Sequence, residues 1–511
     1  MISHIKELIV VMALALAVFA AAKPLCLRFM RAEDYTLRRN VWLVLTLCAF
    51  LAPNFWVYAL VALVVLVWAA RRDSNPAALY LLAYAIIPPI KIYLPVVGIN
   101  QLFALDQARI LSLVVLLPLA YRLFAANEGG IARKLTPLDW LLVAYTLLQL
   151  AVVSPYESFT NTMRRGFLFS IDTLVVYYVF SRAMVNRRVL VDALAVFVLV
   201  GGVYATIGIF ESFKGWLMYE QIAPGWGAIN DGSFLLRDGS LRAQASAGHS
   251  LTLGYTLAMA LGVWFYLRSE VASRAARLLV PAVLCLGLYA THSRGPWLTG
   301  VVVYFIYLFI APGSKSQLLK GLAVFTVIVG VLLVTPFGAR IIDMLPFIGT
   351  VDQANVIYRQ RLATESWHLI LQNPWLGDPF VTLKMDDLKQ GYGFVDLMNA
   401  YAAVGLFNGF VGLALFLGFF FGATGRAYAV QRKSGMTAPD LSGVGAALVA
   451  CMLASFFFMA TASIDWIEYV LAGLLSGYVS LLARRAAAVP ASGYTRPPIS
   501  PERGSVVLGK S

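Results

Sequence analysis

Charged side chains are scarce in this chain: they make up 13% of the residues, whereas hydrophobic residues make up 60%. A soluble protein of 511 residues needs more charged surface than this. Apolar runs of about 17 to 22 residues recur along nearly the whole chain, and a helix of that length crosses the ~30 Å hydrocarbon core of a bilayer. The composition therefore argues against a soluble enzyme and predicts an all-α, polytopic membrane helix bundle.

The sequence also lacks the short motifs of several catalytic classes. It contains no P-loop, no GxGxxG after a strand, no HExxH and no GxSxG. No CxxC or metal-ligand spacing joins its four cysteines, which lie in or beside apolar runs and which we interpret as small core residues. We therefore expect neither a metal ion nor another cofactor. We find no convincing internal repeat, which argues modestly against transporters built from inverted repeats.

We predict about 13 to 15 membrane helices in a single bundle over residues 1–485. The stretch 41–70 is either two short helices that turn at Pro53-Asn54 or one long helix. The first apolar run has no small-residue cleavage site before charged residues return, so we interpret it as a retained helix. The tail, 486–511, is rich in Ala, Pro, Gly and Ser and is predicted to be disordered on the cytoplasmic side. The predicted spans lie near 5–25, 41–52, 54–70, 78–97, 105–122, 137–154, 167–182, 189–210, 250–267, 278–291, 296–312, 318–336, 396–422, 443–462 and 465–483.

Basic residues between the apolar runs fall on one side of the membrane under these spans. The positive-inside distribution makes that side cytoplasmic. The net charge of +14 is mostly this orientation signal, so we do not expect nucleic acid as a partner. Two long loops, about 211–249 and about 337–395, remain on the opposite side, where long loops commonly carry function. The basic clusters are Arg28/Arg31/Arg38/Arg39, Arg71/Arg72, Arg133/Lys134, Arg182/Arg187/Arg188, Arg268/Arg274/Arg277, Lys315/Lys320, Arg426/Arg432/Lys433 and Arg484/Arg485.

The first long loop has the composition of a sugar-binding surface. Aromatic rings stack on the apolar faces of sugars, and amides and carboxylates bind their hydroxyl groups. The loop returns to the membrane through Arg242 and His249. The alternative is that its tryptophans belong to the interfacial aromatic belt of the membrane. The aromatic and polar residues concerned are Trp216, Trp226, Asn230, Asp231 and Asp238.

Arg294 lies in a very short turn between two apolar runs on the same side as the long loops. Its guanidinium offers a planar fork that binds phosphate oxygens bidentately and stays charged at any accessible pH. His292, two residues earlier, could act as a donor or a base. The alternatives are that Arg294 snorkels to the interface and that His292 is a polar residue of the belt.

The second long loop contains the pattern of an amphipathic helix over residues 361–371, which we expect to lie on the membrane surface. Asn373-Pro374 and Gly377 predict its end. Arg361 lies in the first turn, where a cation does not stabilise the helix dipole, and this favours a functional role. The apolar positions are Leu362, Trp367, Ile370 and Leu371.

Carboxylates on this side are candidate general bases, although most are expected to be solvated loop charges. Asp396 is the best placed, because it lies where the second loop meets an apolar run. Asp465 and Glu468 share one helix face at the mouth of the last hairpin. The others are Glu211, Asp231, Asp238, Glu365, Asp378, Asp386 and Asp387.

Two basic residues lie inside or at the end of early spans. A charge at the bilayer centre costs ~3 kcal/mol on insertion scales, so it normally faces a cavity or a partner. Lys91 follows Pro88-Pro89, where the helix must break. Arg109 is close to Asp106 in the sequence, and we predict a local ion pair.

Four segments together resemble the O-antigen ligase and O-antigen polymerase superfamily. They are LRAQASAGHSLTLGY around Arg242, THSRGPWL around Arg294, RLATESWHLILQNPWLGDP from Arg361, and DLMNAYAAVGLFNGFVG. Proteins of this superfamily are bacterial inner-membrane glycosyltransferases of the GT-C-like kind. They act at the periplasmic face on glycans carried by undecaprenyl diphosphate. The resemblance covers roughly residues 190–425, and the order and spacing of its motifs are more specific than any one of them.

The resemblance is carried by individual positions. Arg242 and His249 match the family's R-x-x-G-x-x-x-H-P-N region, with Ser250 where proline is usual. Arg294 matches the arginine of S-R-G-x-W. Further matches in the second loop and beyond it are Arg361, Trp367, Pro374, Gly377, Asn399, Tyr401, Gly409 and Gly412. Met398 occupies the place of a histidine that in the ligases is a leading candidate for acceptor activation or diphosphate contact.

The resemblance implies a metal-independent glycosyltransferase with a lipid-diphosphate donor. Arg242, Arg294 and Arg361 would clamp the diphosphate. A base, Asp396 or His249, would deprotonate the acceptor hydroxyl. Asn399, Tyr401 and Trp367 would support the glycan or the loop. Because methionine cannot replace the histidine at position 398, we favour a polymerase over a ligase that transfers the glycan to a lipid A-core acceptor.

Two alternatives of other classes remain open. The same arginines would serve a transporter or flippase for a lipid-linked or anionic solute, but transport would predict charges deeper in the membrane than Lys91. A non-catalytic partner of polysaccharide chain-length or export proteins would instead tolerate the loss of Arg242 or Arg294.

Overall fold

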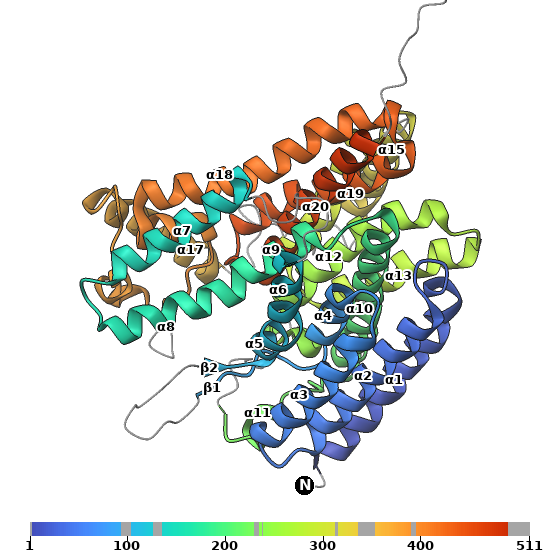
Figure 1. The fold of residues 1–511 in the computed structure, drawn as a ribbon, viewed down its shortest axis with the longest axis horizontal. Helices are drawn as coiled ribbons and strands as arrows, with labels where there is room; N and C mark the ends of the chain where they lie inside the picture. Colours follow the sequence, from blue (N-terminus) through green and yellow to red (C-terminus); the bar gives the residue numbers. More distant parts are fainter. Residues whose placement is uncertain are drawn as a thin grey trace, which may run out of the picture.

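The computed structural model describes residues 3–93, 104–125, 135–228, 235–237, 239–311, 315–335, 353–389 and 395–488. Most of these residues are helical, which confirms the all-α prediction (Figure 1). The first half contains α1 (Ser3–Cys26), α2 (Ala32–Leu51), α3 (Phe55–Arg72), α4 (Pro76–Tyr84), β1 (Ile92–Tyr93), β2 (Ala104–Leu105), α5 (Gln107–Leu111), α6 (Leu117–Ala125), α7 (Pro137–Val153), α8 (Phe159–Phe169), α9 (Val175–Arg182), α10 (Arg187–Lys214) and α11 (Ile222–Gly225). The second half contains β3 (Leu236–Arg237), β4 (Ser240–Leu241), α12 (Ser250–Leu267), α13 (Arg274–Ala290), α14 (Arg294–Ile310), α15 (Lys315–Val334), α17 (Gln353–Gln372), α18 (Ala400–Thr437), α19 (Pro439–Met459) and α20 (Trp466–Ala488).

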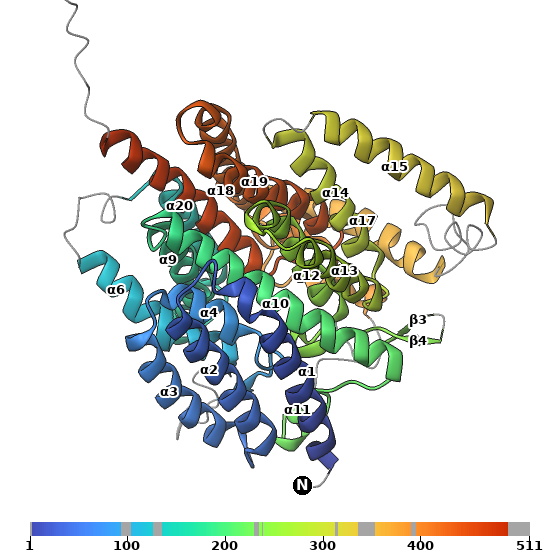
Figure 2. The same ribbon diagram turned by 90° about the vertical axis from the view of Figure 1, so that its right-hand side faces the viewer.

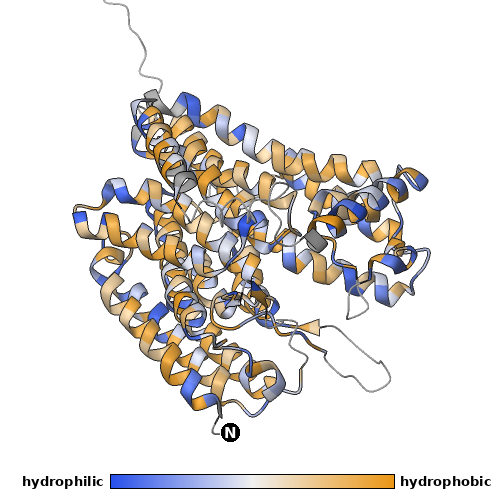
Figure 3. Cartoon of the chain, turned by 180° about the vertical axis from the view of Figure 1, so that it is seen from behind, coloured by the Kyte–Doolittle hydropathy of each residue, from blue (hydrophilic) through white to orange (hydrophobic). Residues whose placement is uncertain are grey.

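Within the described residues, eight helical segments are long and apolar enough to cross a membrane, and three shorter apolar helices accompany them. Hydrophobic residues run along the helices, whereas hydrophilic residues gather at helix ends and in connections (Figure 3). The chain is therefore a multi-pass membrane helix bundle. The predicted number of 13 to 15 spans exceeds these eight, because several predicted spans are short or carry charges. α4, for example, has only nine residues.

The structure settles the alternative at residues 41–70 in favour of two helices. α2 ends at Leu51 and α3 begins at Phe55, so the turn falls at Pro53-Asn54. Asn54 caps α3, because its side-chain Oδ1 accepts a hydrogen bond from the backbone N–H of Val57 at 3.1 Å. An asparagine at this position satisfies a backbone donor that the helix itself leaves unpaired.

The predicted span 78–97 is wrong in its second half. α4 ends at Tyr84, and the chain continues through Pro88-Pro89 into strand β1, which pairs with β2. Proline lacks a backbone N–H and clashes with the preceding turn, so two consecutive prolines end the helix. Lys91 is exposed in this connection. The segment 94–103 lies outside the described residues.

α10 is a central helix of the bundle. It packs against α1, α4, α12 and α13 (Figures 1 and 2). Small residues allow close approach: a Cβ on Gly201 would lie 2.7 Å from the Cβ of Ala260, and one on Gly287 would lie 2.5 Å from that of Ala205. Backbones that approach this closely gain dispersion contacts, which replace the hydrophobic effect as the source of helix association inside a membrane.

One end of the bundle carries a network of arginines and carboxylates, and we call it the cationic end. Glu270, which follows α12, pairs with Arg187 at the start of α10. Arg187 lies 3.7 Å from Asp440 at the start of α19, and Asp440 also pairs with Arg485 near the end of α20. These bonds bring five helix ends together, because Arg28 after α1 donates to the backbone oxygen of Glu270. We call the opposite end, where α12, α14 and α20 begin, the loop end.

Arg38, which the sequence places among the orientation charges, is a core residue. Its side chain is 2% exposed and forms two hydrogen bonds of 2.7 Å with the carboxylate of Asp73. It also donates to Asp192 of α10 at 2.6 Å. The two carboxylates and the guanidinium satisfy one another, which a buried charge requires. The network fixes α2, the segment after α3 and α10 to one another.

Arg109 pairs across the fold rather than locally. Its guanidinium binds the carboxylate of Asp172, with the closest contact at 2.9 Å, and donates to the backbone oxygen of Ala104. Asp106 instead accepts a hydrogen bond from the backbone N–H of Arg109 and caps α5. The predicted pair of Asp106 and Arg109 is therefore a helix cap, and the ion pair links α5 to the π-helical turn Ser170–Leu174.

Candidate functional site

The functional candidates of the first long loop meet the turn between α13 and α14 at the loop end. Arg242 follows β4, and its Nη2 donates to the Ser293 hydroxyl at 2.8 Å, while its Nε donates to the backbone oxygen of Thr291 at 3.4 Å. Arg237, in β3, donates to the backbone oxygen of His292 at 2.8 Å. The hairpin β3–β4 and this turn are thus held together by arginine side chains.

Ser293 immediately precedes Arg294, so these bonds bring the Arg242 guanidinium to the turn from which α14 and Arg294 begin. Arg294 is the first residue of α14, and its Nε and Nη2 atoms are buried. Two of the three arginines that the sequence assigned to a diphosphate therefore belong to this turn, and Arg237, which no sequence motif marked, binds it as well.

Glu211 holds the Arg242 loop in place. The predicted loop began at this residue, but α10 continues to Lys214, and Glu211 is fully buried. Its carboxylate accepts three backbone N–H bonds, from Met218, Gln244 and Ala245, at 2.7 to 3.0 Å. A carboxylate used in this way is an anchor for the backbone that carries Arg242, and we no longer consider it a candidate base.

The second long loop contains the predicted surface helix, which is longer than expected. α17 runs from Gln353 to Gln372, and Gly377 follows it with a positive φ of 70°. Tyr358, Leu362, Leu369 and Ile370 pack with α18 and the segment around 381–388. The buried stripe decides which arginine faces the rest of the protein, since residues 359 and 361 lie on different faces of a helix.

Both arginines are exposed, but Arg359 lies on the side of α17 that carries Ile370 of the buried stripe, whereas Arg361 lies on the opposite side. The Nη2 of Arg359 contacts the sulfur of Met398 at 3.2 Å. Desolvation lowers the pKa of Arg359 and nearby Arg237 adds to this effect, while the Asp396 carboxylate opposes it. The structure thus brings Arg359, rather than Arg361, towards Arg237 and Asp396.

Asp396 is held beside α17 by Tyr358. The backbone N–H of Asp396 donates to the Tyr358 hydroxyl at 3.3 Å. That hydroxyl lies 3.3 Å from the backbone oxygen of Leu388 and 3.5 Å from that of Asp396. Burial raises the pKa of Asp396, and the Arg359 guanidinium counteracts this. A carboxylate with a raised pKa is a better general base than an ordinary aspartate.

Asn399 and Tyr401 have structural contacts at the start of α18. The Asn399 side chain accepts bonds from the backbone N–H groups of Tyr401 and Ala402, which are the first donors of α18. The Tyr401 hydroxyl donates to the backbone oxygen of Phe456 in α19.

Trp367 is 57% exposed on α17, and its ring centroid lies 6.3 Å from that of Phe410.

His249 caps α12. Its Nδ1 accepts a hydrogen bond from the backbone N–H of Leu251 at 3.1 Å, so this nitrogen is unprotonated. Burial and the nearby Arg242 cation lower the pKa of His249 to about 4. Its lowered basicity makes it a weaker base candidate than Asp396.

The cap makes stability depend on pH. Between about pH 6.5 and pH 4 the unfolded chain binds a proton at His249 and the folded chain does not, so the free energy of unfolding should fall as the pH falls through this window. Asparagine caps helices without titrating. We expect thermal unfolding of the detergent-solubilised His249→Asn protein to lose less stability than wild type between pH 7 and pH 4. Parallel curves for the two proteins would contradict this assignment.

Asp465 and Glu468 lie together at the start of α20, as predicted, but they are tied to the backbone. The Glu468 side chain is buried and accepts from the backbone N–H of Asp465 at 2.9 Å. Asp465 accepts from the N–H of Trp466, whose ring stacks on Tyr84 with centroids 3.9 Å apart. This pair shapes the turn before α20.

Trp226 fits neither of the two interpretations of the first loop, a sugar-binding surface or an interfacial aromatic belt. Trp226 is buried, its indole N–H donates to the backbone oxygen of Ala52, and it stacks on Tyr58. It therefore packs against α3 as a core residue. Trp216 is half-buried against the core. The predicted sugar-binding residues Asn230, Asp231 and Asp238 lie outside the described residues.

The glycines of the second loop and α18 form a backbone crossing. Phe410 N–H donates to the Pro374 oxygen at 2.7 Å, and Asp378 N–H donates to the Leu406 oxygen at 2.8 Å. A Cβ on Gly377 would lie 2.5 Å from the Leu406 oxygen, and one on Gly409 would lie 2.4 Å from the Trp375 carbonyl. Gly409, with φ 61° and ψ −165°, also kinks α18. Pro374, Gly377 and Gly409 therefore share one structural role: they lie where the segment after α17 meets the backbone of α18.

The site that emerges has four arginines, Arg237, Arg242, Arg294 and Arg359, and one carboxylate, Asp396, from three separate parts of the chain. Among the described residues, no group of three or more His, Cys, Asp or Glu side chains could hold a metal ion. Such an arrangement can bind a multiply charged anion. The fold and site define a multi-pass membrane protein with an anion-binding candidate site at its loop end. The chain matches no protein-family model and no curated protein sequence.

Proposed function

We propose that this protein is an integral-membrane glycosyltransferase of cell-surface polysaccharide assembly. It polymerises a glycan carried by undecaprenyl diphosphate at the periplasmic face of the bacterial inner membrane, without a metal ion. The observation that carries the proposal is a set of contacts: Arg237 and Arg242 bind the turn just before Arg294, and Arg359 lies near both Arg237 and Asp396. The excess of positive charge in this cluster suits a diphosphate.

In the proposed reaction the arginines bind the donor diphosphate and stabilise the charge that grows on it. The acceptor hydroxyl oxygen attacks the anomeric carbon of the donor and passes its proton to Asp396. The bond between the anomeric carbon and the diphosphate oxygen breaks, and undecaprenyl diphosphate leaves with the electron pair. Guanidinium groups bind phosphate oxygens through paired N–H donors, so they can serve where other enzymes use a divalent cation.

The distribution of basic residues supports the orientation. The cationic end carries most of the arginines and would face the cytoplasm under the positive-inside rule. The loop end would then face the periplasm. A GT-C-like glycosyltransferase would receive its donor laterally from the bilayer, because no nucleotide sugar is supplied there. Chain-length or export proteins are the expected protein partners.

Met398 supports a polymerase more than a ligase. Its sulfur contacts Arg359, so the residue occupies the site, yet it can neither move a proton nor bind a diphosphate. A ligase that transfers the finished glycan to a lipid A-core acceptor would need another group for these roles.

The test uses a deletion strain complemented with the wild-type gene or with Arg242→Gln, at equal membrane levels. Undecaprenyl-linked glycans and surface polysaccharide are extracted and sized. We expect single repeat units on the lipid and no long chains in the variant. Long chains that stay on the lipid would identify a ligase. Normal glycans in the variant would refute the arginine clamp and favour a non-catalytic export partner, and normal glycans in the deletion strain would refute any role in the pathway.

A further inference from the structure

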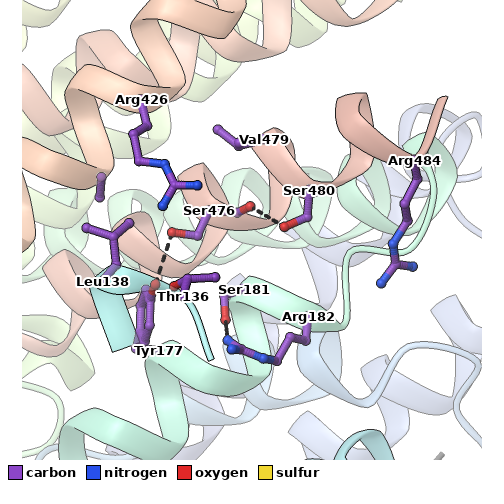
Figure 4. Close-up of a pocket in the computed structure, with 11 residues that line it drawn as sticks. Thr136, Leu138, Tyr177, Ser181, Arg182, Arg426, Ser476, Val479, Ser480 and Arg484 are labelled. Carbon is purple, nitrogen blue, oxygen red and sulfur yellow. Dashed lines mark hydrogen bonds between the residues drawn. The ribbon is translucent and has the colours of Figure 1, made fainter. Parts of the chain in front are cut away.

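A second group of arginines surrounds a cavity at the cationic end, far along the helices from the site already described. The cavity has a volume of about 50 Å³ and lies among α9, α18, α20 and the start of α7 (Figure 4). Room for one water corresponds to about 10–15 Å³ on this measure, so the cavity has room for a group the size of a phosphate. Its polar lining consists of Thr136, Tyr177, Ser181, Arg182, Arg426, Ser476, Ser480 and Arg484.

Positive charge exceeds negative charge in this cavity. Arg182 is 7% exposed and shares its charge with Asp139, at 2.7 Å from Nη2 to the carboxylate. Arg426 reaches the cavity from α18 and Arg484 from α20. Among the residues that the structure describes, no carboxylate lies within ion-pair distance of Arg426 or Arg484. Three guanidinium groups and one carboxylate leave a net charge of +2.

Hydroxyl groups complete the lining. Tyr177 and Ser476 share a hydrogen bond of 3.2 Å between their oxygens, and the Ser480 hydroxyl donates to the backbone oxygen of Ser476. The Ser181 hydroxyl accepts from Arg182 at 2.6 Å, which fixes that guanidinium. A preorganised guanidinium beside hydroxyl donors is the chemistry that recognises phosphate oxygens.

We propose that this cavity binds a phosphate group, either that of an anionic lipid headgroup in the adjacent leaflet or free inorganic phosphate. Basic pockets between membrane helices are suited to anionic headgroups. A bound phosphate would join α18 to α20 across the cavity and would neutralise the charge that Arg426 and Arg484 bring there. The proposal does not depend on the glycosyltransferase function.

The test uses the purified full-length protein, delipidated in a neutral detergent. Thermal unfolding is followed during titration with inorganic phosphate, with short-chain phosphatidylglycerol and with phosphatidylcholine of the same chain length. We expect phosphatidylglycerol or phosphate, but not phosphatidylcholine, to raise the midpoint. The Arg426→Gln/Arg484→Gln protein should bind the active probe at least about tenfold more weakly, because each lost charge-assisted hydrogen bond weakens binding by about this factor.

The matched control is Arg188→Gln/Arg432→Gln, which removes the same charge from exposed positions at the cationic end outside the cavity. It should bind like wild type. A shift with phosphate alone would identify free phosphate as sufficient, and a shift confined to phosphatidylglycerol would identify a lipid. If neither probe raises the midpoint, or if the cavity and control proteins respond alike, the proposal is wrong.

Discussion

Replacing Arg242 by glutamine should lower the rate of glycan transfer by about a hundredfold or more. The loss of one fixed donor to a developing anion costs about that much in other enzymes, because the charge of the transition state then lacks a prepared partner. Arg242 also orients the neighbouring turn through Ser293. Arg242→Lys keeps the charge but not the planar fork, so its activity should fall between glutamine and wild type. The measurement is the rate at which membranes extend lipid-linked glycan chains.

Arg361→Gln is the matched control for this prediction. It removes an arginine from the exposed face of α17, where the described residues show no ion pair for it, and it should retain activity close to wild type. Arg359→Gln, two positions earlier, should lose activity as Arg242→Gln does. Equal effects at 359 and 361 would show that α17 contributes general charge and would contradict the placement of Arg359 beside Asp396.

The helices could be predicted largely from hydrophobic runs and helix caps. Membrane spans depend on length and apolarity, which are local properties, so the helix end at Asn373-Pro374 follows from the sequence, whereas the turn at Pro53-Asn54 was one of two alternatives. The number of spans was less predictable. α4 has only nine residues and is buried around its whole circumference. Hydropathy alone does not distinguish such a short core helix from a membrane span that proline interrupts.

Roles within the site depended on contacts between distant segments. Sequence motifs led to Arg242 and Arg294, but they led to Arg361 where the structure places Arg359. The stripe of Tyr358, Leu362, Leu369 and Ile370 contains the information that would have separated the two, since it sets the face of the helix. Glu211 looked like a loop carboxylate because two of its three backbone partners, Gln244 and Ala245, lie more than 30 residues further on. No local pattern reveals such a partner.

The backbone crossing of α17 and α18 connects stability with the site. α17 carries Arg359, and the residues just before α18 include Asp396, so the crossing at Gly377 and Gly409 controls the distance between cation and base. The sequence resemblance marked these glycines without giving a reason for them. The structure gives one: both occupy conformations with positive φ, and neither has room for a Cβ.

Gly409→Ala should therefore destabilise the protein by about 3 kcal/mol or more, from backbone strain together with overpacking against Trp375. Gly425→Ala is the control in the same helix: a Cβ there meets nothing within 4 Å, so alanine should leave stability unchanged or raise it slightly. Thermal unfolding in detergent checks both. Where Gly409→Ala still folds at low temperature, it should also transfer glycan more slowly, because the displaced α17 moves Arg359 away from Asp396. A Gly409→Ala protein with the stability and activity of Gly425→Ala would show that the two helix segments do not depend on this crossing for their relative position.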